Sequence, residues 1–401
     1  MALDLVRGVA VLGILAINIG GFAGPQAATL SPNVPVPGNF ADHLWFAFAL
    51  LVFEGKMRAL FSLLFGASLL LFIDNAEARG ANGELLQIHR LGWLALFGYL
   101  HWLVWWGDIL FTYALAGFAA LAFRQAPTRV LVAGGLTMFV MWHSLMALQG
   151  LPQVTLEQHV LAGKTNADVA ADYRAERAAA ASATAAEMAG YRQDLLAQAA
   201  AKLNDDPAEP VAGALNTIGE TLPLMLLGMA LYRSGFFAGA WPRRALAGLA
   251  LGGTLTGGAL TAGLIGWAWA HNWPPDAMVA AMAFWLAVPH LLMALGYGAA
   301  LVRWSPHLAA TAPGRRLIAA GRMAFSNYLG MTLVMTSIFY GWGLGLIGTV
   351  PLRWQGLFVL GGWALMLGWS KPWLAQFRQG PLEWLWRSLT LGQRLPLRRR
   401  A

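Results

Sequence analysis

The sequence predicts an all-α membrane protein, a polytopic bundle of about ten transmembrane helices, and three observations lead to this prediction. Apolar residues make up 58% of the 401 residues and charged residues only 11%, whereas soluble domains carry about 25% charged residues. Apolar runs of roughly 18 or more residues recur along the chain, as membrane-spanning helices require. Basic residues fall in every second loop between these runs, which is typical of a chain that crosses a membrane repeatedly.

The apolar runs define the expected spans, because a helix of about 20 residues crosses the hydrocarbon core of a bilayer. Residues 43–53 form a further apolar run that is too short to cross, so we expect it to lie in the interface or to cap the second span. The expected spans cover residues 3–24, 57–73, 89–106, 108–123, 129–149, 212–232, 245–270, 277–301, 317–340 and 354–373.

Basic residues alternate between loops, and this alternation predicts the orientation. The loops at 25–42, 107–108, 271–276 and 341–353 hold a single basic residue, Arg353. Because cytoplasmic loops are enriched in lysine and arginine, we expect an even number of spans with both termini in the cytoplasm. The net charge of +8 then follows from topology, and no nucleic-acid partner is expected. The other loops and the tail carry Arg79, Arg90, Arg124, Arg129, Arg233, Arg243, Arg244, Arg303, Arg315, Arg316, Arg378, Arg387, Arg394, Arg398, Arg399 and Arg400.

Spans and loops divide the chain into four expected parts. Residues 1–149 and 212–374 form two bundles of five spans each, and residues 375–401 form a basic amphipathic tail on the cytoplasmic surface. Residues 150–211 are rich in alanine and predict one or two helices outside the membrane, on the outer or periplasmic side. Two interpretations of this insert stay open, a cover for an outward-facing cleft and a solvated connector.

The most informative stretch runs from His89 to Arg124 and predicts two apolar helices joined by a very short bend. His101 and Asp108 lie next to that bend, on the side opposite the basic ends. Asp108 is well placed to cap the second helix. If it also reaches His101, it would orient the imidazole as the carboxylate of a Ser-His-Asp triad does. The alternative is a neutral histidine bonded to a backbone carbonyl or a tryptophan.

Other polar residues in the apolar runs are candidates for function, because an ionisable group at mid-membrane costs about 2.5–3.5 kcal/mol on insertion scales. Asp4 and Arg7 form either a helix cap with an ion pair or an anchor for a phosphate-bearing cofactor. Asn18 either bonds neighbouring helices together or points its amide at a substrate.

A second group of polar residues suggests a substrate or proton path. Glu220 needs a partner, for which Lys56 and Arg58 lie at a compatible depth. His290 follows Pro289 and either satisfies the backbone carbonyl that the proline frees or takes part in the path. His43 falls near the outer side and is a candidate for the same cleft as the bend.

Several kinds of site are not expected. The chain has no cysteine, which excludes disulfides and thiolate chemistry. No histidine or paired-carboxylate spacing suits a metal, and neither a Walker-type loop nor a dinucleotide fingerprint is present. The start of the chain lacks the features of a removable signal peptide, so we expect the first apolar run to be retained as a helix.

Six sequence motifs, in order along nearly the whole chain, resemble those of the YeiB-like membrane proteins. The resemblance lies in LDLVRGVAVLGI at 3–14 with Asn18, GK at 55–56 with LFSLLFG at 60–66, His101 with GDILFTYAL at 107–115, LGMALYR at 227–233, GRMAFSNYL at 321–329 and GPLEWLWR at 380–387.

More distantly, the opening motif and the FGAS of the second span resemble heparan-α-glucosaminide N-acetyltransferase and other transmembrane acyltransferases. That resemblance implies transfer of an acyl group from cytoplasmic acyl-CoA to an outer acceptor, with a histidine near the outer face. Asp4, Arg7 and Asn18 carry over on matching positions. In those relatives the histidine follows the first span, where this chain has His43, and Met331 stands where a polar residue is expected.

Three functional hypotheses follow. The first is a membrane acyltransferase, in which acyl-CoA is the co-substrate and a small molecule, a lipid or a glycan is the acceptor. His101, oriented by Asp108, acts as base or acyl carrier, and Asn18 polarises the carbonyl or positions the acceptor. The donor would be held by Arg7, Arg322, Asn327 and Tyr328.

The second hypothesis is a secondary transporter with Glu220, His290 and His101 as a proton relay. The third is a scaffold whose polar groups only hold helices together. For all three we expect a bacterial inner-membrane protein in contact with lipids, and a homodimer is compatible with the sequence.

Overall fold

The computed structural model describes residues 1–399. Every secondary-structure element in this range is a helix, which confirms the all-α class. The elements are α1 (Ala2–Ala23), η1 (Gln26–Thr29, a 3-10 helix), α2 (Phe40–Val52), α3 (Lys56–Glu77), α4 (Gly83–Val104), α5 (Leu110–Leu121), α6 (Thr128–Leu161), α7 (Ala167–Tyr191), α8 (Leu195–Asp205), α9 (Glu209–Arg233), α10 (Arg243–Ala270), α11 (Pro275–Ala280), η2 (Ala281–Trp285, a π-helical turn), α12 (Ala287–Ala310), α13 (Ala312–Arg322), α14 (Ala324–Phe339), α15 (Leu352–Gln376) and α16 (Pro381–Leu391).

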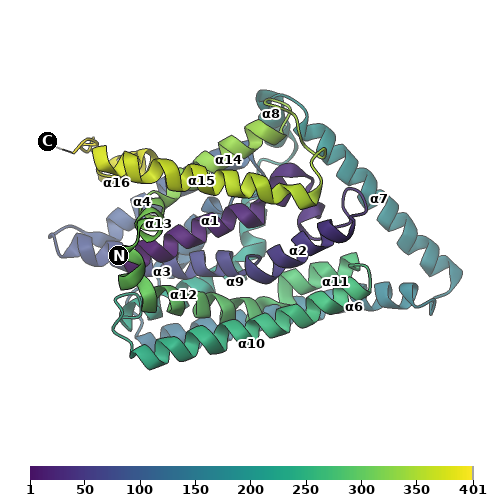
Figure 1. The fold of residues 1–401 in the computed structure, drawn as a ribbon, viewed down its shortest axis with the longest axis horizontal. Coiled ribbons are helices and arrows are strands. Elements are labelled where there is room, and N and C mark those ends of the chain that lie inside the picture. Colours follow the sequence, from purple (N-terminus) through teal and green to yellow (C-terminus); the bar gives the residue numbers. More distant parts are fainter. Residues whose placement is uncertain (400–401) are drawn as a thin grey trace.

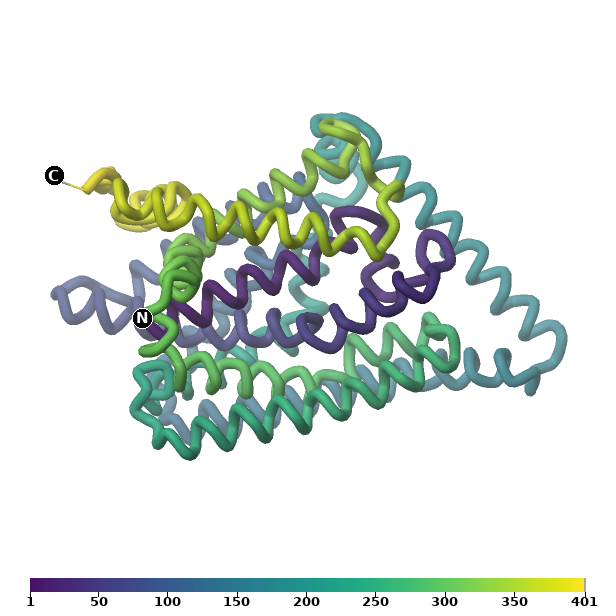
Figure 2. The backbone as a smooth tube through the Cα atoms, viewed as in Figure 1, coloured from purple at the N-terminus to yellow at the C-terminus, as the bar shows by residue number. Residues whose placement is uncertain are grey.

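Most helices run along the long axis of the molecule, and α1 lies near the centre of the bundle (Figures 1 and 2). Helix α1 contacts α3, α12, α13, α14 and α15. Both chain ends lie at the same end of the molecule (Figure 1), as an N-in/C-in arrangement requires. The side of the membrane that this end faces stays a prediction from the loop charges.

Five helical stretches in the described residues are long and apolar enough to cross a membrane, and a sixth is reached if α11, η2 and α12 count as one bent span. Helices α5 and α14 are apolar but shorter. Charged, amide and imidazole side chains lower the mean hydropathy of α4, and charged and amide side chains lower that of α15. The chain is a membrane protein, but the expected number of ten spans is not confirmed.

The expected continuous helix at 277–301 is wrong, because the chain bends there by 51° between α11–η2 and α12. Pro289 has no backbone N–H, and its ring would clash with the carbonyl of Trp285 four residues earlier in a regular helix. The chain accommodates this with a π-helical turn at Ala281–Trp285. Such turns are one of the identifiable causes of sharp helix kinks.

The expected continuous helix at 317–340 is also wrong, because it breaks at Met323, where φ is −116° and ψ is 28°. The break exposes backbone N–H groups at the start of α14. Glu383 of α16 accepts hydrogen bonds from the backbone N–H groups of Phe325, at 2.8 Å, and Ser326, at 3.1 Å. A carboxylate from a distant helix therefore satisfies this helix N-terminus.

The alanine-rich insert forms α7 and α8, while α6 passes through residues 149 and 150 without a break and ends at Leu161. Figure 1 shows α7 running apart from the bundle. Its C-terminal part returns to the bundle, where the Glu187 carboxylate accepts from the Gln26 backbone N–H at 2.9 Å. Tyr191 stacks on Tyr340 with ring centroids 4.7 Å apart.

Helix α2 precedes α3 with only a short turn between them, so 43–53 belongs to a helical stretch that reaches Glu77. The Asn39 side chain and Asp42 form a capping box at its start. Asp42 also pairs with Arg353, whose Nη1 atom lies 2.9 Å from the Asp42 Oδ2 atom. The lone cation of the expected outer loops therefore has a tertiary partner.

Candidate functional site

The candidate site is built on the bend between α4 and α5. At the far end of this hairpin, Arg124 and Glu84 form an ion pair with an N–O distance of 2.5 Å. At the bend, the His101 Nδ1 atom lies 2.7 Å from the Asp108 Oδ1 atom, and both side chains are 4% exposed. The contact between these two residues, which their spacing in the sequence left open, is present.

Asp108 uses its two oxygens for two different donors. Oδ1 faces His101, and Oδ2 accepts from the backbone N–H of Phe111 at 2.8 Å. A β-carbon at Gly98 would lie 2.9 Å from the Asp108 Oδ2 atom, so the close approach of α4 and α5 depends on glycine there. The Asp108 carboxylate can therefore cap the start of α5 and orient the His101 imidazole at the same time.

The other imidazole nitrogen faces α14. His101 Nε2 lies 2.9 Å from the Thr332 Oγ1 atom. With Asp108 as a carboxylate, Nδ1 carries the proton, so Nε2 offers a lone pair that accepts from the threonine hydroxyl. The hydroxyl has an alternative acceptor, the Tyr328 carbonyl oxygen at 3.3 Å. When it turns to that carbonyl, Nε2 is free to accept a proton.

A small cavity of about 220 Å³ adjoins this dyad. Thr332 and Tyr328 line it from α14, and Asn18 lines it from α1. His101 and Asp108 do not themselves line it, and Thr332 separates the imidazole from the space. The Asn18 side chain makes no hydrogen bond with residues 1–399, so its amide is available to a ligand.

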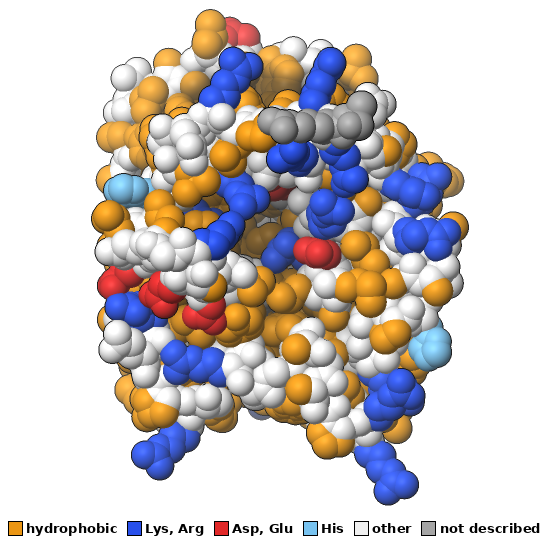
Figure 3. All heavy atoms as spheres, turned by 90° about the vertical axis from the view of Figure 1, so that its left-hand side faces the viewer, with side chains coloured by type: hydrophobic (Ala, Val, Ile, Leu, Met, Phe, Trp, Pro, Cys, Tyr) orange, Lys and Arg blue, Asp and Glu red, His pale blue; other side chains and the backbone are white. Residues whose placement is uncertain are grey.

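A larger cavity of about 760 Å³ lies on the other side of Tyr328, toward the end that carries the chain termini. Figure 3 shows this end of the molecule, where lysine and arginine side chains surround a hollow. Three arginines line the cavity, Arg7 from α1, Arg90 from α4 and Arg322 from α13. Tyr328 lines both cavities, and its ring centroid lies 5.2 Å from that of His101.

The three arginines are only partly neutralised. Arg7 pairs with Asp4 at 3.2 Å, as predicted, and also donates to the Ser68 hydroxyl at 3.0 Å. Arg322 donates to a backbone carbonyl. Arg90 has no carboxylate within 4 Å among the described residues. The cavity therefore favours an anionic ligand, and guanidinium groups match phosphate geometry.

Arg90 and Glu383 were not among the predicted site residues. The Arg90 guanidinium lies between the rings of Phe72, at 4.8 Å, and Trp386, at 4.3 Å. Its only signal in the sequence was its place in a basic loop. Glu383 lines the same cavity, and burial raises its pKa. It lies within the GPLEWLWR motif, but its contact with α14 has no local sequence signal.

Asn327 does not face the large cavity, although we predicted it to hold the donor. Its amide donates to the Ala320 carbonyl at 3.0 Å and to the Ser370 hydroxyl at 3.1 Å. Its oxygen accepts from the Trp369 indole at 2.8 Å. With all its polar atoms engaged, Asn327 holds α13, α14 and α15 together.

The predicted path residues lie elsewhere. Arg58 is the partner of Glu220, with an N–O distance of 3.2 Å. Lys56 donates to the Leu50 carbonyl at 2.6 Å instead. His290 packs against Gly55, and its Nε2 atom has no hydrogen-bond partner in the described residues, so it does not satisfy the carbonyl that the proline frees.

His43 is also remote from the dyad. Its Nε2 atom lies 3.0 Å from the Asn33 Oδ1 atom, and its Nδ1 atom accepts from the Trp273 indole at 3.3 Å. Within residues 1–399, no hydrogen bond joins Glu220 or His290 to His101.

Comparison with known proteins identifies similar chains. The family model described as "Protein of unknown function (DUF418)" matches residues 231–393. The "Uncharacterized protein YeiB" of Escherichia coli strain K12 is 31% identical over 98% of this chain and 96% of its own. The "Uncharacterized protein YxaH" of Bacillus subtilis strain 168 is 29% identical over 97% of this chain and 93% of its own. No solved structure matches significantly.

Proposed function

The chain belongs to the family of the uncharacterized protein YeiB, and we propose that it is an integral membrane acyltransferase of the bacterial inner membrane. In this proposal an acyl group such as acetyl passes from cytoplasmic acyl-CoA to an acceptor at the outer face. The observation that carries the proposal is the position of the His101–Asp108 dyad beside Tyr328, the residue shared by the large basic cavity and the small cavity that Asn18 lines.

The large cavity suits the donor. Acyl-CoA carries several phosphates, and Arg7, Arg90 and Arg322 line a space that opens at the predicted cytoplasmic end. Tyr328 stands between this cavity and His101, so transfer requires its ring to turn aside.

The dyad suits proton transfer from the acceptor. An acceptor O–H or N–H group that reaches His101 from the small cavity, past Thr332, would attack the thioester carbonyl, and His101 Nε2 would take its proton. The new carbon–oxygen or carbon–nitrogen bond forms as the carbon–sulfur bond breaks, and the imidazolium returns the proton to the leaving thiolate. Asp108 stabilises the imidazolium and fixes its orientation. In this proposal the Asn18 amide, which lines the small cavity, donates to the developing oxyanion or to the acceptor.

Two measurements on the purified full-length protein test the proposal. Acetyl-CoA should raise the thermal midpoint of unfolding, because a ligand that binds only the folded state stabilises it. Arg90→Met should reduce this shift, whereas Arg243→Met, at the start of α10 and outside the cavity lining, should not. In sealed vesicles, labelled acetyl transfer should be lost in His101→Ala. Proton-coupled solute uptake without consumption of acetyl-CoA would overturn the proposal in favour of a transporter.

A further inference from the structure

A third cavity, of about 410 Å³, lies at the predicted outer end of the bundle between α1, η1, α2, η2 and α15. It is separate from the candidate acyl-transfer site. Ala16, Ile17, Ile19 and Gly20 line it from one face of α1, whereas Asn18 lines the small cavity from another face. Helix α1 therefore stands between this cavity and the dyad.

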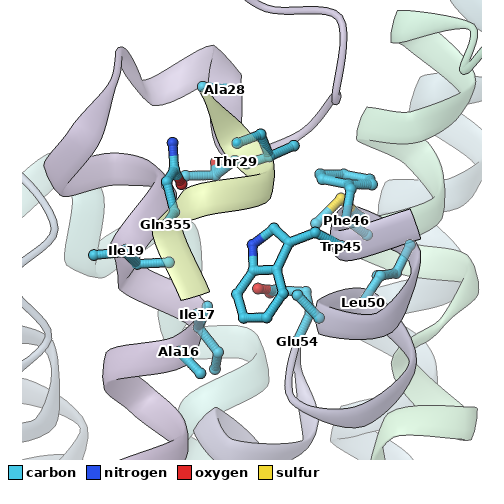
Figure 4. Close-up of a pocket in the computed structure, with 14 residues that line it drawn as sticks. Ala16, Ile17, Ile19, Ala28, Thr29, Trp45, Phe46, Leu50, Glu54 and Gln355 are labelled. Carbon is cyan, nitrogen blue, oxygen red and sulfur yellow. The ribbon is translucent and has the colours of Figure 1, made fainter. Parts of the chain in front are cut away.

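Three polar side chains that line this outer cavity, Gln355, Glu54 and Trp45, make no side-chain hydrogen bond within residues 1–399. Gln355 is 6% exposed, and its Oε1 atom has no hydrogen-bond partner in the described residues. The Glu54 carboxylate and the Trp45 indole N–H likewise make no side-chain hydrogen bond within residues 1–399. Figure 4 shows Gln355 and Thr29 on one side of the cavity, and Trp45 with Glu54 on the other. A buried polar group without a partner is costly, so Gln355, with the half-buried Glu54 and Trp45 facing the same space, indicates a polar ligand.

The chemistry of the cavity restricts that ligand. Gln355 and Glu54 offer acceptors and need donors, while the Trp45 indole offers a donor and needs an acceptor. A hydroxyl group supplies both functions, whereas an ammonium group supplies donors alone. The Trp45 ring packs on Gly356, where any side chain would collide with it. It therefore presents a positioned aromatic surface, which suits an apolar ring face.

Charge excludes a strongly ionic ligand. Glu54 shares its turn with Lys56, and the next basic residue, Arg58, already pairs with Glu220. The two acidic and two basic side chains balance, so a bound cation or anion would leave an uncompensated charge in a partly buried space. From these contacts we propose that the outer cavity binds a neutral polyhydroxylated ring, with Trp45 against its apolar face and Gln355 and Glu54 accepting from its hydroxyl groups.

The experiment uses full-length protein in lipid nanodiscs free of glycosidic detergent, with D-glucose and myo-inositol as probes. Choline serves as the cationic probe and inorganic phosphate as the anionic one. Binding is followed by Trp fluorescence and by saturation-transfer NMR of the probe. The ring polyols should bind saturably, and choline and phosphate should not bind in this cavity.

Gln355→Leu should weaken polyol binding on the order of tenfold, because a hydrogen bond to a buried acceptor is lost. Glu54→Gln keeps an acceptor and should retain most of the affinity. Gln153→Leu, on α6 away from the cavity, is the matched control. Trp45→Phe keeps an aromatic ring at this position but removes the indole N–H. It provides an independent test if Gln355→Leu does not fold.

No saturable binding of either polyol to the wild-type protein would overturn the proposal. So would equal affinities for wild type, Gln355→Leu and Trp45→Phe, because the polyol would then bind elsewhere. Choline binding that Glu54→Gln abolishes would replace the neutral ligand by a cationic one. None of these outcomes depends on acyl transfer, which is measured at the other two cavities.

Discussion

The His101 Nδ1 atom lies 2.7 Å from the Asp108 Oδ1 atom across the bend between α4 and α5, and the His101 Nε2 atom lies 2.9 Å from the Thr332 hydroxyl, 231 residues further along the chain. The first contact is local and orients the imidazole. The second joins its other nitrogen to Thr332, which lines the small cavity. In the proposed reaction the Thr332 hydroxyl turns to the Tyr328 carbonyl, which frees Nε2 for a proton.

Asp108→Asn should reduce acyl transfer by about two to four orders of magnitude, the range typical of general acid–base catalysis and of triad carboxylates. Asp108 accepts from both His101 and Phe111, whereas an asparagine has one acceptor oxygen and must give up one of these bonds. Loss of a single hydrogen bond costs only about 1 kcal/mol of stability. Initial rates and thermal midpoints of the same preparation separate the two effects, and unchanged rates would contradict the role of the dyad.

Breaking the Arg58–Glu220 pair should destabilise the bundle unless both charges are removed. Either Arg58→Met or Glu220→Gln leaves one ionisable group without its partner, at a cost of about 2–3 kcal/mol by analogy with insertion scales. The double variant should be more stable than the sum of the two losses predicts. The unfolding midpoints of the wild type, the two single variants and the double variant, measured in the same detergent, give the coupling energy between the two side chains. Simple additivity would show that the 3.2 Å contact carries no energy.

Gly66→Ala should destabilise the contact between α3 and α9. A β-carbon at Gly66 would collide with the Met225 backbone, and Gly228 meets the Leu63 backbone in the same way. Small residues allow such close helix packing in membranes. Gly252→Ala is the matched control, because a β-carbon there meets no atom within 4 Å. Its thermal midpoint should stay equal or rise, since alanine favours helix by about 1 kcal/mol over glycine.

The attachment of the insert should depend on pH through Lys202. Its Nζ atom donates to the Trp102 carbonyl at 2.5 Å, and burial lowers the pKa of Lys202 from 10.5 to about 8. Between these two values the unfolded chain binds more protons than the folded one, so the free energy of unfolding contributed by this group rises with pH. Below pH 8 the lysine is charged in both states and the contribution no longer changes.

The Lys202→Met variant should therefore not show this rise of the free energy of unfolding with pH. The thermal midpoint of the wild type relative to the variant, measured at several pH values between 8 and 10.5, checks the prediction. A difference that stays flat across this range would mean that Lys202 is solvated rather than packed against Trp102.

The sequence predicted features that depend on local pattern. Apolar composition and loop charge placed the chain in the membrane, and the α4–α5 hairpin followed from two apolar runs with a short bend. The Asp4–Arg7 pair and the choice of Arg58 as a candidate partner for Glu220 could be anticipated, because sequence spacing or helix depth brings these residues within reach. Spacing placed His101 and Asp108 next to the bend but left their contact open, and only the structure shows it.

Other features depended on helices that are distant in sequence. The breaks at Met323 and at Ala281–Trp285 reflect a carboxylate from α16 and a strained proline turn, so apolar composition alone predicted unbroken helices. Asn327 belonged to a motif with an expected binding role, yet its neighbours on α13 and α15 engage all its polar atoms.

By itself, the sequence determined that this protein is an α-helical membrane protein with an imidazole and a carboxylate at one bend. Only the tertiary structure decided that Thr332 and Tyr328 face this imidazole and that Arg90 lines a cavity with Arg7 and Arg322. The physical reason is that hydropathy and loop charge act along each helix, whereas the rotation and depth of each helix are set by packing against its neighbours. A cavity exists only between helices, so no single stretch of sequence encodes it.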